Sequence, residues 1–297
     1  MATLIEKLHV PADAFGERLD RFLARALCVD LERARVLVAR GDVRIRGKTC
    51  SFHRKLFGGE EVVVERAVPR PERAPVGPAL AALYDDPDCL VVAKPAGLPV
   101  LPSRRGAPSA AGAATRLGAF DVDGRALPGL PHRLDRDTSG CLLLARTDRA
   151  LAAVRRAFEE GKVEKEYLAL VQGAPPDRGA LDTPYARSPA DPRRFTTRVP
   201  SARRARLSFE VEERLRGAAL LRVLLDTGRT HQIRVQLGEA GFPVLGDPVY
   251  GVPSDAIARQ ALHAARLAFP RPSDGARIEV RAEMPEDLAR AIAALRE

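Results

Sequence analysis

The sequence predicts an α+β protein with a mixed sheet in a large domain that follows a small one. The chain has 297 residues, which suggests one large domain or two unequal ones. A proline-rich stretch at 67–79, AVPRPERAPVGPA, suits neither a helix nor a strand ladder and predicts a semi-rigid linker. After it, several apolar strand patterns follow one another directly instead of alternating with helices, which favours a mixed sheet over a doubly wound parallel one.

Two helices are expected to open the small domain, residues 1–66. Apolar residues recur at helical spacing from Leu19 to Leu27. A second helical pattern begins after an N-cap at Asp30 and stops at Gly41.

Short strands with basic faces are expected to complete this domain. VRIRG at 43–47 alternates apolar and basic residues, which predicts a strand with a turn at Gly47-Lys48. EEVVVE at 60–65 predicts a closing strand. The basic side chains of the first strand and its turn are Arg44, Arg46 and Lys48.

The large domain is expected to span residues 80–297. Apolar runs predict strands at CLVVA (89–93), CLLLAR (141–146), EYLALV (166–171), ARLSFEVEE (205–213) and ALLRVLLD (219–226). Helices are predicted at 148–161, with Asp148 as the N-cap and Gly161 as the stop, and at 285–296. Small and polar residues at 104–116 predict a mobile surface segment.

The composition favours a polyanionic partner and an intracellular location. Forty-eight Lys and Arg against 39 Asp and Glu give a net charge of +9, which indicates nucleic acid first and a membrane surface second. The N-terminus lacks the apolar run of a signal peptide, and no segment is apolar enough to span a bilayer. The four cysteines form no CxxC pair, which fits a reduced cytosol. Because no metal-binding or phosphate-loop motif is present, no cofactor is expected.

Two motifs concentrate chemically capable side chains. HRLDRDTSG at 132–140 is a loop that enters a strand and holds Asp135 and Asp137 between arginines Arg133 and Arg136. Such arginines keep a carboxylate ionised and also hold phosphates, and the spacing alone does not say which aspartate faces a site. By itself, the motif also fits a solvated, hydrogen-bonded turn.

The second motif, TGRTHQIRVQL at 227–237, follows a predicted strand. Thr230 is the expected N-cap of a helix that carries His231, Arg234 and Leu237 on one face. Arg234 would pair bidentately with a carboxylate from another loop, although an ordinary helix start with an exposed arginine fits as well.

Two further segments suit RNA. Tyr167 opens a predicted strand, where its ring fits a core edge or a stacking platform for a flipped base. Residues 187–206 hold seven arginines and one acid, Asp191, which fits a phosphate-binding lip as well as a solvated loop. Arg203 and Arg204 belong to this lip.

Together these motifs resemble the RluA-type pseudouridine synthase family. HRLDRDTSG is followed by KEYLALVQG and then by GRTHQIRVQL and GFPVLGDPVYG, with KPAGLPVLP ahead of them, so the resemblance covers about 80–270 in the family's order. RLDRFLA, GDVRIRGK and GGEEVVVE in the small domain resemble an S4 RNA-binding domain.

The resemblance implies a fold, an activity and residue roles. It implies a largely antiparallel catalytic sheet, with Asp135 as the catalytic aspartate, Arg234 as its paired arginine and Tyr167 as the site tyrosine. Arg133 would fill the space left by the extruded base, and Arg136, Arg229 and His231 would contact RNA beside it. The implied reaction breaks the N-glycosidic bond of a uridine and joins C5 to C1′. Asp135 either attacks C1′ or takes a proton from C2′, and the residues leave both routes open.

The expected protein is therefore a monomeric, cytoplasmic RNA isomerase without a cofactor that acts on large-subunit ribosomal RNA. A tRNA-directed synthase is the nearest alternative. A non-catalytic RNA-binding or ribosome-assembly protein is a second, which the intact Asp135, Tyr167 and Arg234 disfavour. A glycosidic hydrolase is a third, but it needs two carboxylates on either side of the bond, and Asp135 and Asp137 share one short loop.

Overall fold

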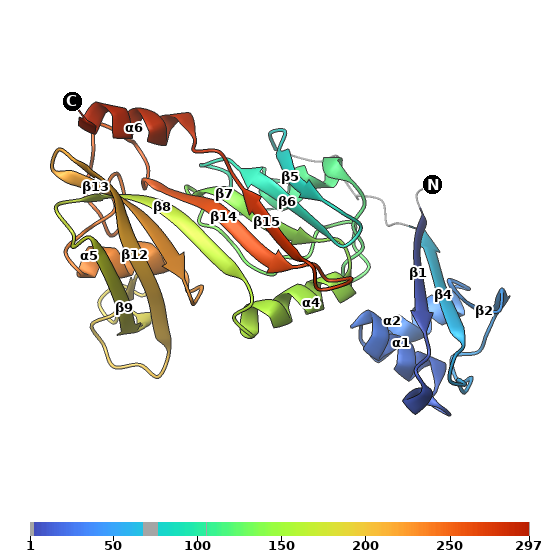
Figure 1. The fold of residues 1–297 in the computed structure, drawn as a ribbon. Helices are drawn as coiled ribbons and strands as arrows, with labels where there is room; N and C mark the ends of the chain where they lie inside the picture. The colour runs from blue at the N-terminus through green and yellow to red at the C-terminus, as the bar shows by residue number, and fades with distance from the viewer. Residues whose placement is uncertain (1–2, 68–76, 105, 297) are drawn as a thin grey trace.

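The computed structural model describes residues 3–67, 77–104 and 106–296 (Figure 1). Most of the expected linker, 68–76, lies outside the described residues. The strands are β1 (Thr3–His9), β2 (Val43–Ile45), β3 (Lys48–Thr49), β4 (Glu61–Ala67), β5 (Ala81–Asp85), β6 (Cys89–Lys94), β7 (Ser139–Ala145), β8 (Glu164–Gln172), β9 (Arg178–Pro184), β10 (Ala186–Arg187), β11 (Phe195–Thr196), β12 (Arg204–Leu215), β13 (Ala218–Leu225), β14 (Leu262–Pro270) and β15 (Arg277–Arg281). The α-helices are α1 (Leu19–Leu27), α2 (Leu31–Ala39), α3 (Ala110–Ala114), α4 (Asp148–Glu159), α5 (Gln232–Glu239) and α6 (Glu286–Arg296).

The N-terminal segment forms a four-stranded antiparallel sheet, in the order β1-β4-β2-β3, with α1 and α2 packed on it. Both helices form as predicted, and the Asp30 side chain caps α2 by accepting from the Arg33 amide at 2.7 Å. Strand β1 was not predicted. It pairs with β4 along its whole length, although Ile5 on its outer face is exposed.

The predicted turn at Gly47-Lys48 is wrong by one residue. Arg46 and Gly47 occupy the turn with φ of 51° and 76°, and Lys48 already pairs with Ile45 in β3. A two-residue hairpin of this kind needs positive φ at both central residues, so Arg46 is held in the left-handed region.

Apart from a separate two-stranded sheet of β10 and β11, the remaining strands of the described residues build a nine-stranded sheet, in the order β5-β6-β7-β14-β8-β13-β12-β9, with β15 paired to β14. Every neighbouring pair in it is antiparallel except β7 and β14. The predicted α+β class with a mixed, largely antiparallel sheet is therefore confirmed. Strands β5, β9, β14 and β15 were not predicted.

The parallel pairing of β7 with β14 depends on one glycine. Gly140 has a φ of +116°, and a Cβ placed on it would lie 2.1 Å from the carbonyl oxygen of Ala264. No larger residue fits this close approach. Gly140 thus fixes the start of β7, directly after the HRLDRDT loop, against β14.

Two predicted helix starts are wrong. The N-cap of α4 is Thr147, whose hydroxyl accepts from the Ala150 amide at 3.2 Å, while Asp148 is already the first helical residue. Helix α5 begins at Gln232, and its N-cap is His231 in the left-handed conformation instead of Thr230.

The prediction of a mobile surface segment at 104–116 is also wrong for its second half. Ser109 caps α3 by accepting from the Gly112 amide, and the alanines of the helix pack into the main core. Small residues fit this position because they let the helix approach its neighbours closely. Such a run is hard to distinguish from a polar loop by composition alone.

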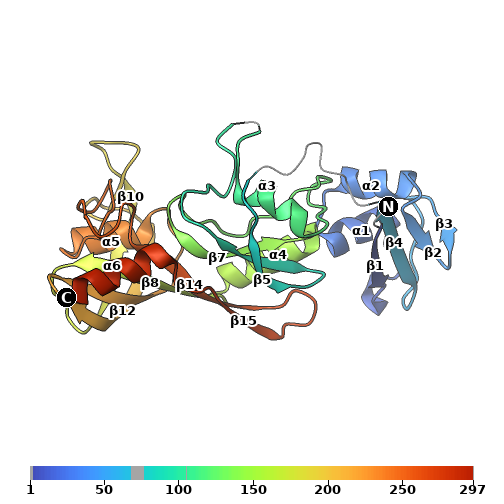
Figure 2. The ribbon, with the colours of Figure 1, turned by 90° about the horizontal axis from the view of Figure 1, so that it is seen from above.

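The N-terminal segment and the large sheet each have their own cluster of buried apolar residues. They meet through ion pairs near α4 (Figure 2). Arg33 of α2 contacts the buried Asp121 at 3.2 Å, and Arg149 of α4 lies 3.5 Å from Glu6 of β1. Within the described ranges, no helix is long and apolar enough to cross a membrane.

Candidate active site

The HRLDRDT loop is held in place by backbone contacts on both sides. The Lys94 ammonium is almost fully buried and donates to the carbonyl oxygens of Pro95, Leu98 and Arg136, each at 2.8 Å. From the other side, Arg259 donates to the Asp137 carbonyl at 3.1 Å. The loop closes on itself where the Thr138 amide donates to the Asp135 carbonyl at 3.2 Å. These contacts fix the direction in which the Asp135 side chain leaves the backbone.

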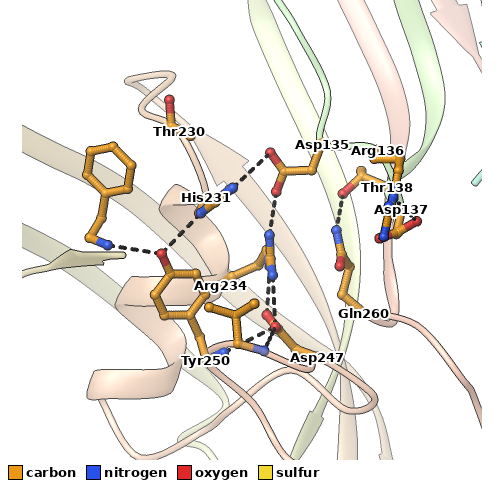
Figure 3. A network of polar contacts seen from close by, with 12 residues as sticks. Asp135, Arg136, Asp137, Thr138, Thr230, His231, Arg234, Asp247, Tyr250 and Gln260 are labelled. Atoms are coloured by element: carbon orange, nitrogen blue, oxygen red, sulfur yellow. Dashed lines mark hydrogen bonds and ion pairs between the residues drawn. The ribbon is translucent and has the colours of Figure 1, made fainter. Parts of the chain in front are cut away.

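The Asp135 side chain points at Arg234, which lies in the first turn of α5 (Figure 3). Nη1 of Arg234 donates to Oδ2 of Asp135 at 2.9 Å across 99 residues of sequence. Arg234 is only 5% exposed, so water screens this pair little. The guanidinium is therefore a fixed positive charge and hydrogen-bond donor beside Oδ2 of Asp135.

The two-pronged contact that was predicted for Arg234 goes to a different carboxylate. Nε and Nη2 of Arg234 donate to the two oxygens of Asp247 at 2.7 and 2.8 Å. Asp247 also accepts from the backbone amides of Val249 and Tyr250. Burial opposes ionisation of Asp247, but the Arg234 guanidinium and the two amides outweigh it and lower the pKa of Asp247. Asp247 therefore fixes the guanidinium plane and leaves Nη1 free for Asp135.

His231 stands on the other side of Asp135. Its Nε2 lies 3.8 Å from Oδ1 of Asp135, and its Nδ1 is 3.0 Å from the hydroxyl of Tyr250. Burial lowers the pKa of His231, with the Asp135 charge acting in the opposite direction, so the imidazole is neutral at pH 7.

A cavity opens over these groups. It is lined by Arg133, Leu134, Asp135, Thr138, Tyr167, Leu225, Arg229, His231, Gln232, Ile233, Arg234 and Leu262. The structure therefore brings Asp135, Tyr167 and Arg234 together, with Arg133, Arg229 and His231 beside them. Burial, followed by the Asp135 charge, raises the pKa of Tyr167, so its phenol stays neutral.

The other predicted site residues lie outside this cavity. Arg136 is exposed and pairs with its neighbour Asp137 at 3.0 Å, and Arg204 pairs with Asp182 at 2.8 Å. Arg203 is exposed on the same segment as Arg204. Arg44, Arg46 and Lys48 are exposed on β2, β3 and their turn, at the opposite end of the molecule from α5 (Figure 1).

Asp137 does not cap the turn that the motif suggested. An aspartate before Thr138, Ser139 and Gly140 can accept from their backbone amides, but its carboxylate does not do so here. It accepts instead from the Arg136 guanidinium, through three contacts of 3.0 to 3.2 Å. The turn at this point is closed by the Asp135 carbonyl, which accepts from the Thr138 amide.

Sequence reasoning missed the residues that support the central pair. Four such residues contact the HRLDRDT loop, Arg234 or His231: Lys94, Asp247, Tyr250 and Arg259. Lys94 and Asp247 stand in the motifs KPAGLPVLP and GFPVLGDPVYG, whose glycines and prolines indicated special loops but assigned no role to either side chain.

Comparisons with known proteins agree with this geometry. The family described as RNA pseudouridylate synthase matches residues 88–239, which include the HRLDRDT loop, β8 and all of α5. A ribosomal large subunit pseudouridine synthase D from Xanthomonas campestris is 38% identical, over 97% of this chain and 92% of that protein. An uncharacterized RNA pseudouridine synthase from Bacillus subtilis is 36% identical, over 95% of each.

A solved structure supports the same assignment. Human RNA pseudouridylate synthase domain containing 1 superposes with a TM-score of 0.58 and 27% identity, over 73% of this chain and 86% of that one. The sheet, the cavity and the sequence relatives thus lead to one conclusion: the chain belongs to the RluD-like RNA pseudouridylate synthase family and is an isomerase that converts uridine in RNA to pseudouridine.

Proposed function

We propose that this enzyme modifies uridines of large-subunit ribosomal RNA, with Asp135 as its catalytic carboxylate. The observation that carries the residue assignment is the Asp135–Arg234 pair, which lines the cavity and whose arginine is buried. The target follows from similarity: proteins from Xanthomonas campestris and Zymomonas mobilis, 38% and 34% identical, are named ribosomal large subunit pseudouridine synthase D.

The chemistry needs one ionised carboxylate and no net transfer of atoms. The N1–C1′ bond of uridine breaks, the uracil turns, C5 bonds to C1′, and the proton on C5 is released while N1 gains one. Asp135 starts this sequence either by attacking C1′ or by removing the C2′ proton. Arg234 holds the carboxylate through Oδ2 and aims it, and Oδ1 is the oxygen that Arg234 leaves free.

The walls of the cavity suit an extruded base. A uridine has to leave its stack to reach Asp135, and the aromatic ring of Tyr167 beside the carboxylate offers a surface for it. Arg133 and Arg229 are exposed at the same cavity and would grip phosphates or fill the space that the base vacates. Arg136 would extend this basic rim.

RNA binding would extend over both domains. We assign residues 1–66 to an S4-like RNA-binding domain, 67–79 to a linker and 80–297 to the catalytic domain, in keeping with the two separate apolar cores. Arg44, Arg46 and Lys48 would hold the RNA backbone on the first domain, and Arg203 and Arg204 on the second. The enzyme would act as a monomer in the cytoplasm.

Nucleotide-resolution mapping of pseudouridine tests this proposal. RNA from cells that lack the protein is compared with RNA from the same cells that express either the wild type or the Asp135→Asn variant. We expect one or more sites in large-subunit ribosomal RNA to appear with the wild type only. Sites confined to tRNA would replace the proposed target. Sites that also appear with Asp135→Asn would overturn the catalytic assignment.

A further inference from the structure

Two hydrogen bonds and one longer polar contact connect the arginine-rich residues 187–206 to Asp135. The backbone amide of Phe195 donates to the hydroxyl oxygen of Tyr250 at 3.0 Å. The same hydroxyl is 3.0 Å from Nδ1 of His231, and the opposite ring nitrogen, Nε2, faces Oδ1 of Asp135 at 3.8 Å (Figure 3).

This chain of contacts selects one tautomer of His231. The Tyr250 hydroxyl has one proton, and one of its lone pairs is already used by the Phe195 amide. If the hydroxyl donates to Nδ1, the neutral ring carries its proton on Nε2, and an N–H faces the carboxylate. In the other tautomer, a nitrogen lone pair would face the negative charge of Asp135 and the hydroxyl proton would lose this partner. Both ends of the chain therefore favour the Nε2–H form.

The backbone and the neighbouring rings hold the imidazole in this orientation. His231 has a φ of 60°. This left-handed conformation is energetically unfavourable for a residue with a side chain and is maintained only where the surroundings impose it. Its ring packs edge-on against Phe195 and Tyr250, with centroid distances of 6.0 and 5.5 Å. The strained residue therefore presents a fixed Nε2 edge to Asp135.

We propose that His231 is a positioning residue whose Nε2–H, fixed by Tyr250, orients the free oxygen Oδ1 of Asp135 toward the ribose of the bound uridine. This inference rests on the proposed role of Asp135. Arg234 already holds Oδ2 at 2.9 Å, so the carboxylate can still turn about that contact. The partial positive charge of the Nε2–H on the Oδ1 side attracts this oxygen and limits the rotation. At 3.8 Å the contact is electrostatic and is not a hydrogen bond, so the Oδ1 lone pairs stay available for reaction.

The charges around His231 are consistent with this role. Asp135 and Asp247 face the ring with negative charge, and Arg234 and Arg133 face it with positive charge. The ring thus remains a neutral donor at neutral pH and leaves Arg234 as the only cation that contacts Asp135 among the described residues.

Histidine NMR tests the tautomer without any assay of activity. Long-range ¹H–¹⁵N correlation spectra of the wild-type protein should show His231 as Nε2–H, with the signal assigned by its loss in His231→Phe. His132 is an internal reference of the opposite form, because its Nε2 accepts from the Leu143 amide at 2.9 Å. Tyr250→Phe should give a mixture of His231 tautomers. An Nδ1–H form in the wild type would overturn the proposal; if His231→Phe fails to fold, the signal is assigned by its loss in His231→Gln instead.

Single-turnover kinetics test the effect on Asp135. At saturating enzyme, His231→Phe should convert RNA at least about 10-fold more slowly, because a small misplacement of the reacting group is costly, while the half-saturating concentration stays unchanged. His231→Gln keeps an N–H at a similar reach and should recover part of the rate. The double variant His231→Phe/Tyr250→Phe should be no slower than His231→Phe alone.

Two outcomes would contradict the role of His231 as a positioning residue. A normal rate with weaker binding in His231→Phe would make His231 an RNA contact, and a His231→Gln variant as slow as His231→Phe would exclude the donor. Tyr84→Phe removes a tyrosine hydroxyl that bonds Asp86 outside the cavity; it is the matched control for Tyr250→Phe and should keep the wild-type rate. Failure of the proposed function is distinguishable, because Asp135→Asn would then still convert RNA.

Discussion

Replacing Asp247 with asparagine should lower both the stability and the turnover rate of the enzyme by more than its distance from the substrate suggests. Its side chain is completely buried, and both of its oxygens accept from Arg234, at 2.7 and 2.8 Å. Asparagine keeps the shape, but it loses the charge and places an amide N–H₂ against one arginine N–H. The guanidinium then keeps Asp135 as its only carboxylate and loses the contact that fixes its plane.

The size of the effect follows from this burial. Breaking a buried ion pair by removing one charge costs about 3–5 kcal/mol of unfolding free energy, which corresponds to a fall in Tm of about 10 °C for a chain of this length. The single-turnover rate should also fall, by about 100-fold, because Arg234 no longer aims Asp135. Asp137→Asn is the control, because it alters an exposed ion pair and should cost less than about 1 kcal/mol.

The assay combines thermal unfolding by circular dichroism with tritium release from RNA that contains C5-labelled uridine. The pKa of Asp247 is lowered in the folded protein, so the ion pair stabilises the fold at neutral pH and this contribution disappears as the pH falls through the lowered value. The difference in stability between the wild type and Asp247→Asn should therefore shrink below about pH 4. A Tm within 2 °C of the wild type at pH 7, with unchanged turnover, would refute this reasoning.

Two further predictions concern the loop support and the N-terminal domain. Burial lowers the pKa of Lys94 to about 8, and a neutral amine has too few protons for three carbonyl acceptors, so turnover should fall as the pH rises past about 8. In the unfolded chain the lysine keeps its proton up to about pH 10.4, so the unfolding free energy should rise between about pH 8 and pH 10.4. A loss of stability over the same pH range, measured by pH-dependent melting, would contradict the assignment. Removing residues 1–79 should weaken RNA affinity and reduce its dependence on salt, while bound RNA is still converted. A folded 80–297 fragment that converts no RNA at any concentration would show that the N-terminal domain takes part in catalysis.

The sequence predicted those parts of the fold that depend on local patterns. The helices at Leu19–Leu27 and Leu31–Ala39 have clear apolar periodicity, and the Asp30 cap is a short-range signal. Helix α3 was missed because a run of alanines and glycine resembles a loop until its packing partners are known. The position of the α5 cap was also missed, because the left-handed His231 is imposed by tertiary contacts and not by its own preference.

The same division holds for the site. Asp135 and Arg234 were found because each stands in a distinctive motif, and the structure brings them within 2.9 Å. Asp247 was not found, because nothing in the residues around it indicates that Arg234 has two carboxylate partners. Such a contact is a property of the fold. The bidentate geometry that was predicted for Arg234 is made with Asp247 and not with Asp135.

The most direct test of the account is the single-turnover tritium release of Asp135→Asn. The variant removes the negative charge at position 135, beside the cavity. Arg234 retains its ion pair with Asp247, so the contact that stabilises the arginine in the fold is unchanged. We predict no detectable release from C5-labelled uridine RNA, with RNA affinity and Tm close to those of the wild type, and nearly normal release by the matched variant Asp137→Asn. Release by Asp135→Asn at a rate near that of the wild type, or an inert but folded Asp137→Asn, would contradict the central claim.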